Sequence, residues 1–159
     1  MIKRGISLVV IALLVSLSAF LSSCAKEPKE DEVLQEAIDA QRTDRFDDAI
    51  ASFQLFIKSF PKSQKVPEAL YALGIVYQRK KDFRNAVTTF KRVVDGYPDN
   101  PTASGAAYLR AMLLNEELKD TSAARSAYEV FLKRYPNAPM AGSARIELAN
   151  LVKSTNKKK

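Results

Sequence analysis

Apolar side chains recur at intervals of three and four residues along most of the chain after residue 33. Residues at this spacing lie on one side of an α-helix, so each run predicts an amphipathic helix with one apolar face. Two such runs follow one another between residues 66 and 97: Leu70, Leu73, Gly74 and Tyr77, and then Ala86, Phe90, Val93, Val94 and Tyr97. Between the runs, Lys81-Asp82 predicts a turn, with Asp82 capping the second helix.

This two-helix pattern occurs three times. Each copy ends in an aromatic residue and a proline, and the prolines are spaced by 37 and then 38 residues: Phe60-Pro61, Tyr97-Pro98 and Tyr135-Pro136. Each second helix carries an alanine and, four residues later, an aromatic ring: Ala49 and Phe53, Ala86 and Phe90, Ala124 and Tyr128. One hairpin cannot bury its apolar face alone, whereas three stacked hairpins make a continuous core. Small residues at Gly74 and Ala86 would let paired helices approach, with Phe90 filling the space beneath them.

The Leu73-Gly74…Tyr77 half, the Ala86…Phe90 half and the terminal Pro98 resemble the tetratricopeptide repeat (TPR) family. The resemblance implies an all-α fold, a right-handed superhelical stack of about three helical hairpins plus a C-terminal capping helix. The TPR domain is expected over 33–152, with repeats at about 33–62, 66–99 and 103–137, a cap at 138–152 and a basic tail at 153–159. Arg145, Glu147 and Asn150 are expected on the outer, solvent face of the cap.

The N-terminus has the features of an export signal. Lys3 and Arg4 precede a mostly apolar run over 6–20, which ends in Leu21-Ser22-Ser23-Cys24. This ending resembles the lipobox of bacterial lipoproteins, which implies a signal peptide at 1–23 and acyl chains such as palmitate on Cys24. Ala25 in place of an aspartate implies the outer membrane, on its periplasmic face. Residues 24–32 are predicted to be a lipidated, charged tether. A plain secretory signal and a retained membrane anchor are the alternatives.

The composition excludes several kinds of catalytic and metal-binding chemistry. The chain has no histidine, and its single cysteine is Cys24, so histidine acid–base catalysis and His or Cys metal sites are excluded. No glycine-rich phosphate loop, nucleophile elbow or zinc-protease motif occurs. We therefore predict no enzyme activity, no metal, no small-molecule substrate and no cofactor other than the covalent lipid on Cys24. Asp44, Asp47 and Asp48 lack the spacing of a calcium loop and are predicted to be helix-start residues.

The net charge of +7 raises the question of nucleic acid. The basic residues are mixed with acidic ones and collect near helix ends, which favours helix termini and solubility over a phosphate track. We predict no nucleic-acid partner. Protein partners in the cell envelope are expected instead, and cell-wall polymer is kept as an alternative.

A binding surface is predicted on the first helix of each hairpin, which lines the concave face of such stacks. Residues one turn from the core run recur at a spacing of 37: Leu34, Ile38 and Gln41; Tyr71, Ile75 and Gln78; Tyr108, Met112 and Asn115. Aromatic, aliphatic and amide side chains suit an extended or helical peptide segment. The alternative is that Tyr71, Ile75 and Met112 are core between neighbouring repeats. Tyr71→Ala is predicted to leave melting nearly unchanged, whereas Phe90→Ala should be strongly destabilising.

Two periplasmic groups share this style of repeat. The lipobox and the run from Tyr97 to Arg110 resemble the outer-membrane lipoprotein BamD, whereas the compact three-repeat length resembles the C-terminal domain of YbgF (CpoB). BamD proteins carry about five repeats, so their C-terminal ones are missing from this sequence. The resemblance implies a non-catalytic periplasmic scaffold in outer-membrane β-barrel protein assembly. Tol-Pal-linked envelope coordination and cell-wall polymer binding are the alternatives.

Overall fold

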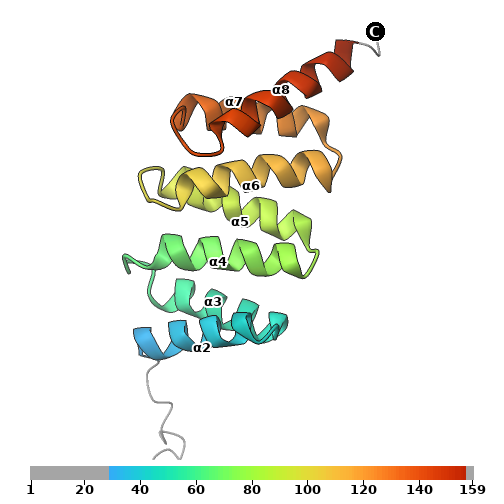
Figure 1. The fold of residues 1–159 in the computed structure, drawn as a ribbon. Helices are drawn as coiled ribbons and strands as arrows, with labels where there is room; N and C mark the ends of the chain where they lie inside the picture. Colours follow the sequence, from blue (N-terminus) through green and yellow to red (C-terminus); the bar gives the residue numbers. More distant parts are fainter. Residues whose placement is uncertain (1–28, 157–159) are drawn as a thin grey trace, which may run out of the picture.

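The structure, a computed structural model, describes residues 29–156. Within that range the chain forms seven α-helices and no strand. They are α2 (Glu30–Arg42), α3 (Phe46–Ser59), α4 (Val66–Arg79), α5 (Phe83–Gly96), α6 (Ala103–Glu116), α7 (Thr121–Arg134) and α8 (Ala141–Asn156). Figure 1 shows three antiparallel hairpins stacked one on the next, with α8 at the far end of the stack. The all-α repeat stack predicted from the sequence is confirmed.

The turns inside the three hairpins share one backbone feature. Asp44, Lys81 and Lys119 have positive φ angles of 58°, 63° and 54°, and each directly precedes the residue at the N-cap position of the following helix. Asp82 caps α5, because its carboxylate accepts a hydrogen bond from the backbone N–H of Asn85 at 3.3 Å. Asp120 caps α7 in the same way through Ala123, at 2.9 Å. The predicted cap at Asp82 is therefore confirmed, and its equivalent recurs in the third hairpin.

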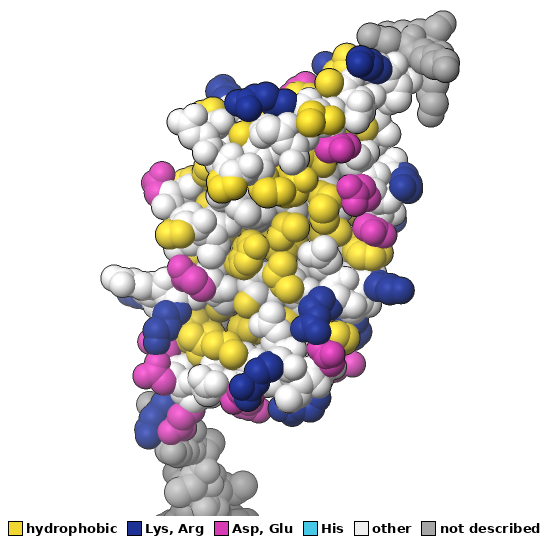
Figure 2. Space-filling view, viewed as in Figure 1, with side chains coloured by type: hydrophobic (Ala, Val, Ile, Leu, Met, Phe, Trp, Pro, Cys, Tyr) yellow, Lys and Arg dark blue, Asp and Glu magenta, His cyan; other side chains and the backbone are white. Residues whose placement is uncertain are grey.

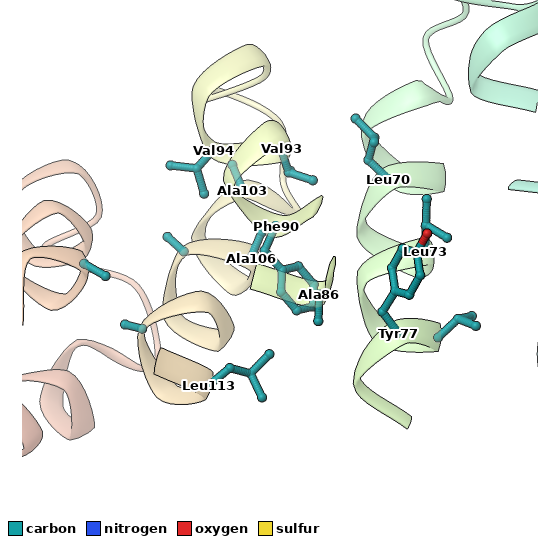
Figure 3. Close-up of a cluster of buried hydrophobic side chains, with 14 of the residues drawn as sticks. Leu70, Leu73, Tyr77, Ala86, Phe90, Val93, Val94, Ala103, Ala106 and Leu113 are labelled. Carbon is teal, nitrogen blue, oxygen red and sulfur yellow. The ribbon is translucent and has the colours of Figure 1, made fainter. Parts of the chain in front are cut away.

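The close approach of the paired helices depends on Gly74. A Cβ atom placed on Gly74 would lie 2.5 Å from Cε1 of Phe90, which is closer than real Cβ contacts. Phe90 and Ala86 are fully buried on the facing helix. Figure 3 shows Phe90 and Ala86 of α5 between α4 and α6, with Leu73 and Tyr77 facing them from α4. The glycine thus makes room for the ring, as the sequence pattern predicts.

Polar contacts join each hairpin to the next. Gln54 of α3 donates a hydrogen bond to the hydroxyl oxygen of Tyr77 on α4, at 2.9 Å. Between the second and third hairpins, the Arg134 guanidinium donates to the carbonyl oxygen of Val94 at 3.0 Å. The Tyr135 hydroxyl donates to the carbonyl of Pro98 at the same distance. These contacts join residues more than twenty positions apart, so they fix how the hairpins stack as well as each hairpin itself.

Both ends of the stack extend further than predicted. α2 begins at Glu30, inside the segment 24–32 that was expected to be a tether. Its first turn is acidic, which suits the positive end of the helix dipole, and the Glu30 carboxylate accepts a hydrogen bond from the Ser63 hydroxyl at 2.7 Å. At the other end, α8 continues to Asn156, beyond the expected cap boundary at residue 152 and into the predicted tail.

The outer face of α8 also differs from the prediction. Arg145 and Asn150 are exposed as expected, but Glu147 is only partly exposed and lies within 3.5 Å of the Asn115 amide on α6. Ile146, a large hydrophobic residue of the same helix, is 63% exposed. The sequence pattern alone did not fix which side of α8 packs against the third hairpin.

Candidate functional site

The nine residues of the predicted binding surface all lie on α2, α4 and α6, the first helices of the three hairpins. These helices face the viewer in Figure 1, and we call the surface they form the first-helix face. All nine side chains keep some exposure, and Ile38 is 42% exposed. Figure 2, from the same side, shows hydrophobic side chains gathered over α4 and α6 with charged groups around them.

The row formed by Leu34, Tyr71 and Tyr108 is half-buried. The two tyrosine rings of this row also contact the second helices. The Tyr71 ring lies 5.8 Å from the Phe90 ring, centroid to centroid. The Tyr108 ring is 5.8 Å from the Phe131 ring. Both interpretations of this row, surface and core, therefore apply in part. Tyr71→Ala is expected to lower stability, which differs from the sequence-based prediction, since its ring supports Phe90.

The other two rows are better suited to contact a partner. Ile38, Ile75 and Met112 form an aliphatic row, and each is exposed or partly exposed. Gln41, Gln78 and Asn115 form an amide row beside it. The amide row gives hydrogen-bonding groups next to an apolar strip, which is the combination that an amphipathic segment requires.

A pocket that the sequence did not predict lies next to Tyr71. Its volume is about 420 Å³. It is lined mainly by apolar groups from α4, α6, α7 and the loops before α6 and α8: Tyr71, Pro101, Thr102, Ser104, Gly105, Phe131, Ala138, Pro139 and Met140. A Cβ atom on Gly105 would lie 3.3 Å from the Tyr71 hydroxyl, so the absent side chain keeps this space open. Only the stacking of two repeats and of the loop before α8 brings these residues together, so periodicity could not reveal the pocket.

The acidic side chains near the start of α3 form ion pairs with basic side chains of the next hairpin. Asp47 and Asp48 lie in the first turn of α3, where the prediction placed them, and Asp44 lies in the turn before it. Asp44 pairs with Arg79 and Asp47 pairs with Lys80, both from the end of α4. The hydrogen bond from Lys80 to Asp47 raises the pKa of the Lys80 ammonium. These contacts between hairpins were not apparent from the sequence.

Across residues 29–156 no group of three or more His, Cys, Asp or Glu side chains is arranged to hold a metal ion. None of the helices in this range is long and apolar enough to cross a membrane. The signal peptide predicted at 1–23 and the lipidation site at Cys24 lie outside the described residues.

Comparison with solved structures supports the repeat fold. A crystal structure of a tetratricopeptide repeat protein from Parabacteroides merdae superposes with a TM-score of 0.62 at 21% identity. The match covers 76% of this chain and 47% of that chain. At this identity the likeness shows the fold alone.

The chain is also similar to curated sequences that share one name. The chain is 25% identical over 151 residues to outer membrane protein assembly factor BamD of Caulobacter vibrioides, covering 84% of this chain and 50% of that protein. The same identity holds over 171 residues of the protein of that name from Neisseria gonorrhoeae, covering 89% of this chain and 64% of the relative. The chain thus spans about half to two thirds of the length of these relatives.

A family model described as "YfiO: Outer membrane lipoprotein" matches residues 26–153, which include all three hairpins and most of α8. The lipobox-like ending at Cys24 lies just before the matched segment. The chain therefore belongs to the YfiO family of outer membrane lipoproteins, and its association with the outer membrane follows from that membership.

Proposed function

We propose that this protein is a non-catalytic scaffold that binds a segment of a partner protein on its first-helix face during the assembly of outer membrane proteins. The observation that carries the proposal is the regular set of exposed and partly exposed apolar side chains on α2, α4 and α6. Ile38, Ile75 and Met112 lie at equivalent positions of three successive hairpins. A partner segment that follows the stack can therefore contact each hairpin in the same way.

The membrane anchor in this proposal is a lipid on Cys24, which holds the domain on the periplasmic side of the outer membrane. Because α2 begins at Glu30, residues 25–29 are what remains of the tether. Five residues span at most roughly 17 Å when fully extended. The first hairpin is thus expected close to the lipid surface, with the stack extending away from it. The lipid is the only non-protein group in the proposal.

The name of the relatives supports the assembly role. Both BamD proteins are called outer membrane protein assembly factors, and most of this chain aligns with them. The binding partner is proposed to be a protein that takes part in the same process. Tol-Pal-linked coordination of the envelope and binding of cell-wall polymer are the competing roles.

Crosslinking in cells followed by purification and mass spectrometry tests this function. The native lipoprotein is compared with Ile38→Glu, which places a charge in the aliphatic row, and with Leu55→Glu on α3. Leu55 is 45% exposed and Ile38 is 42% exposed, so the two variants are matched in exposure. We expect Ile38→Glu to reduce recovery of the partner more than about tenfold, because an unpaired charge would be buried in the interface. Leu55→Glu should bind as the native protein does.

The identity of the recovered proteins decides the role. Recovery of proteins of the outer-membrane assembly process, lost in a Cys24→Ser variant, would support the proposal. Recovery of Tol, Pal or cell-wall synthases would favour envelope coordination instead, and salt-sensitive pelleting with purified sacculi would favour the wall polymer. Equal losses in Ile38→Glu and Leu55→Glu would contradict the assignment of the first-helix face.

A further inference from the structure

The loops before α4, α6 and α8 share a backbone hydrogen bond and lie along one edge of the stack, on the left of Figure 1. In each loop an N–H donates to the carbonyl of the aromatic residue three positions earlier: Ser63 to Phe60 and Asn100 to Tyr97 at 3.0 Å, and Ala138 to Tyr135 at 3.1 Å. This shared geometry makes Ala138 the equivalent of Asn100. Met140, two residues further on, is the equivalent of Lys65.

Polar contacts close this edge between the first helices of the first three hairpins. Asp31 near the start of α2 pairs with Lys65, at 2.7 Å. Glu68, its equivalent near the start of α4, accepts a hydrogen bond from the Asn100 amide at 2.8 Å. In both places a carboxylate in the first turn of a first helix meets a polar donor from the loop that leads into the next first helix.

Between α6 and α8 these polar groups are replaced. The position of the carboxylate is Gly105, which follows Glu68 by 37 residues. The positions of the donors Asn100 and Lys65 are held by Ala138 and Met140. All three replacements line the pocket next to Tyr71. The pocket is therefore found where the third copy lacks the polar contact of the first two.

The lining of the pocket specifies the chemistry of an occupant. None of its nine lining residues carries a charge, so a charged side chain would lose its hydration there without a partner of opposite charge. Tyr71 and Phe131 contribute aromatic groups and Met140 contributes a thioether. Aromatic rings pack favourably against other rings and against methionine sulfur. The volume of about 420 Å³ is in the range of clefts that hold small organic groups.

The pocket adjoins the first-helix face through Tyr71. Tyr71 lies one helical turn from Ile75, so both residues are on the same side of α4. Ile75 belongs to the aliphatic row that the proposed function assigns to a partner segment. A segment that lies over Ile75 can therefore place one of its side chains beside the Tyr71 ring.

We propose that the pocket next to Tyr71 binds an uncharged aromatic side chain of the partner segment that lies on the first-helix face. This inference rests on the proposed function and adds the chemistry by which the segment is recognised. The aliphatic row contacts each hairpin in the same way, whereas the pocket occurs at the third hairpin, where Gly105 replaces the carboxylate. The aromatic side chain thus fixes which part of the segment lies over which hairpin.

Methionine methyl NMR of the full lipoprotein in lipid nanodiscs tests the pocket by itself. Met140 lines the pocket and Met112 lies in the aliphatic row, so isotope-labelled methyl groups report on each surface separately. The probe is N-acetyl-phenylalaninamide, compared with N-acetyl-leucinamide and N-acetyl-lysinamide. We expect the aromatic probe to shift the Met140 signal saturably at roughly millimolar concentration, because so small a molecule makes few contacts. The Met112 signal should stay in place, the leucine probe should bind more weakly, and the lysine probe should shift neither signal.

A pair of glycine variants shows whether the space beside Gly105 is the binding site. Gly105→Glu introduces the carboxylate of the earlier hairpins, and Gly142→Glu makes the same change in the first turn of α8, where an added Cβ would meet nothing within 4 Å. Glutamate suits the first turn of a helix, so both variants should fold, which thermal melting verifies. Gly105→Glu should weaken binding of the aromatic probe more than about tenfold, because it fills the pocket and adds a charge. Gly142→Glu should bind the probe as the native protein does.

The crosslinking experiment in cells links the pocket to the partner. Gly105→Glu should reduce recovery of the partner, as Ile38→Glu does, whereas Gly142→Glu should not. The inference is overturned, and the proposed function stands, if Ile38→Glu lowers recovery while Gly105→Glu does not. It is also overturned if the aromatic probe leaves the Met140 signal in place or binds no better than the leucine probe. A loss of recovery in Gly105→Glu but not in Ile38→Glu would support the pocket and contradict the role of the aliphatic row.

Discussion

The hairpin α4–α5 and the helix α8 place equivalent residues in opposite surroundings. Gly74 on α4 lies under the Phe90 ring so closely that a single added carbon atom would clash with it. Ala149 on α8 follows Gly74 by 75 residues, the sum of the repeat spacings of 37 and 38, so it is the equivalent position, and it is exposed. Helical periodicity thus determines which residues share a face. Whether that face becomes core or surface depends on a second helix that packs against it, and this comparison can be tested by substitutions on both sides.

The largest expected effect is at the centre of the closed hairpin. Phe90→Ala should lower the free energy of unfolding by about 3–5 kcal/mol, because it removes a fully buried ring and leaves a cavity. Ile146→Ala on the exposed side of α8 should change it by less than about 0.5 kcal/mol. Urea denaturation followed by circular dichroism measures both. Similar losses in the two variants would mean that α8 is covered in solution.

The second test concerns the glycine. Gly74→Ala should lower the free energy of unfolding by roughly 1–3 kcal/mol despite the better helix propensity of alanine, because the new Cβ overlaps Phe90. In a Phe90→Leu background the added cost should be smaller, which a double-mutant cycle would detect as coupling. Ala149→Leu, which adds a larger group at the equivalent position of α8, should be close to neutral. A large loss from Ala149→Leu would show that Ala149 is buried in solution.

A third test compares two closed hairpins with each other. Tyr128 occupies the position of Phe53 and Phe90, and its hydroxyl is buried without a hydrogen-bond partner in the protein. Burial raises the pKa of this hydroxyl. Tyr128→Phe should raise the free energy of unfolding by about 1 kcal/mol, since it removes a buried polar group that lacks a partner. Thermal melting provides the measurement, and a lower melting temperature would show that the hydroxyl is satisfied in solution.

The smallest expected effect lies at the opposite end of the stack from α8. Asp31 in the first turn of α2 pairs with Lys65 at 2.7 Å, and the hydrogen bond from Lys65 holds the pKa of the Asp31 carboxyl below its ordinary value. A carboxyl with a lowered pKa contributes stability at higher pH, and this contribution is lost as the pH falls through the folded-state value. Lys65→Met should therefore raise the Asp31 pKa, as measured by NMR titration. The effect on melting should be slight, because both groups are at the surface.

The binding surface shows where prediction from sequence succeeds and where it stops. The spacing of 37 residues identified which side chains of the first helices line up, and all nine lie on α2, α4 and α6 as expected. The spacing did not show that the Tyr71 ring contacts the Phe90 ring, because that contact depends on the distance between α4 and α5. The pocket beside Tyr71 was missed for the same reason, since Phe131 and Met140 reach it from other elements.

Periodicity, caps and small residues by themselves determined the helices, their pairing into hairpins and the room for Phe90, because these features depend on local spacing and on neighbours within one repeat. The lipobox-like motif at Cys24 is likewise a local signal, and it remains a prediction. The tertiary structure alone decided where α2 and α8 begin and end, which acidic residues pair with Arg79 and Lys80, and that Ile146 on α8 is exposed in this structure. Each of these depends on contacts between repeats, which combine residues that no local pattern connects.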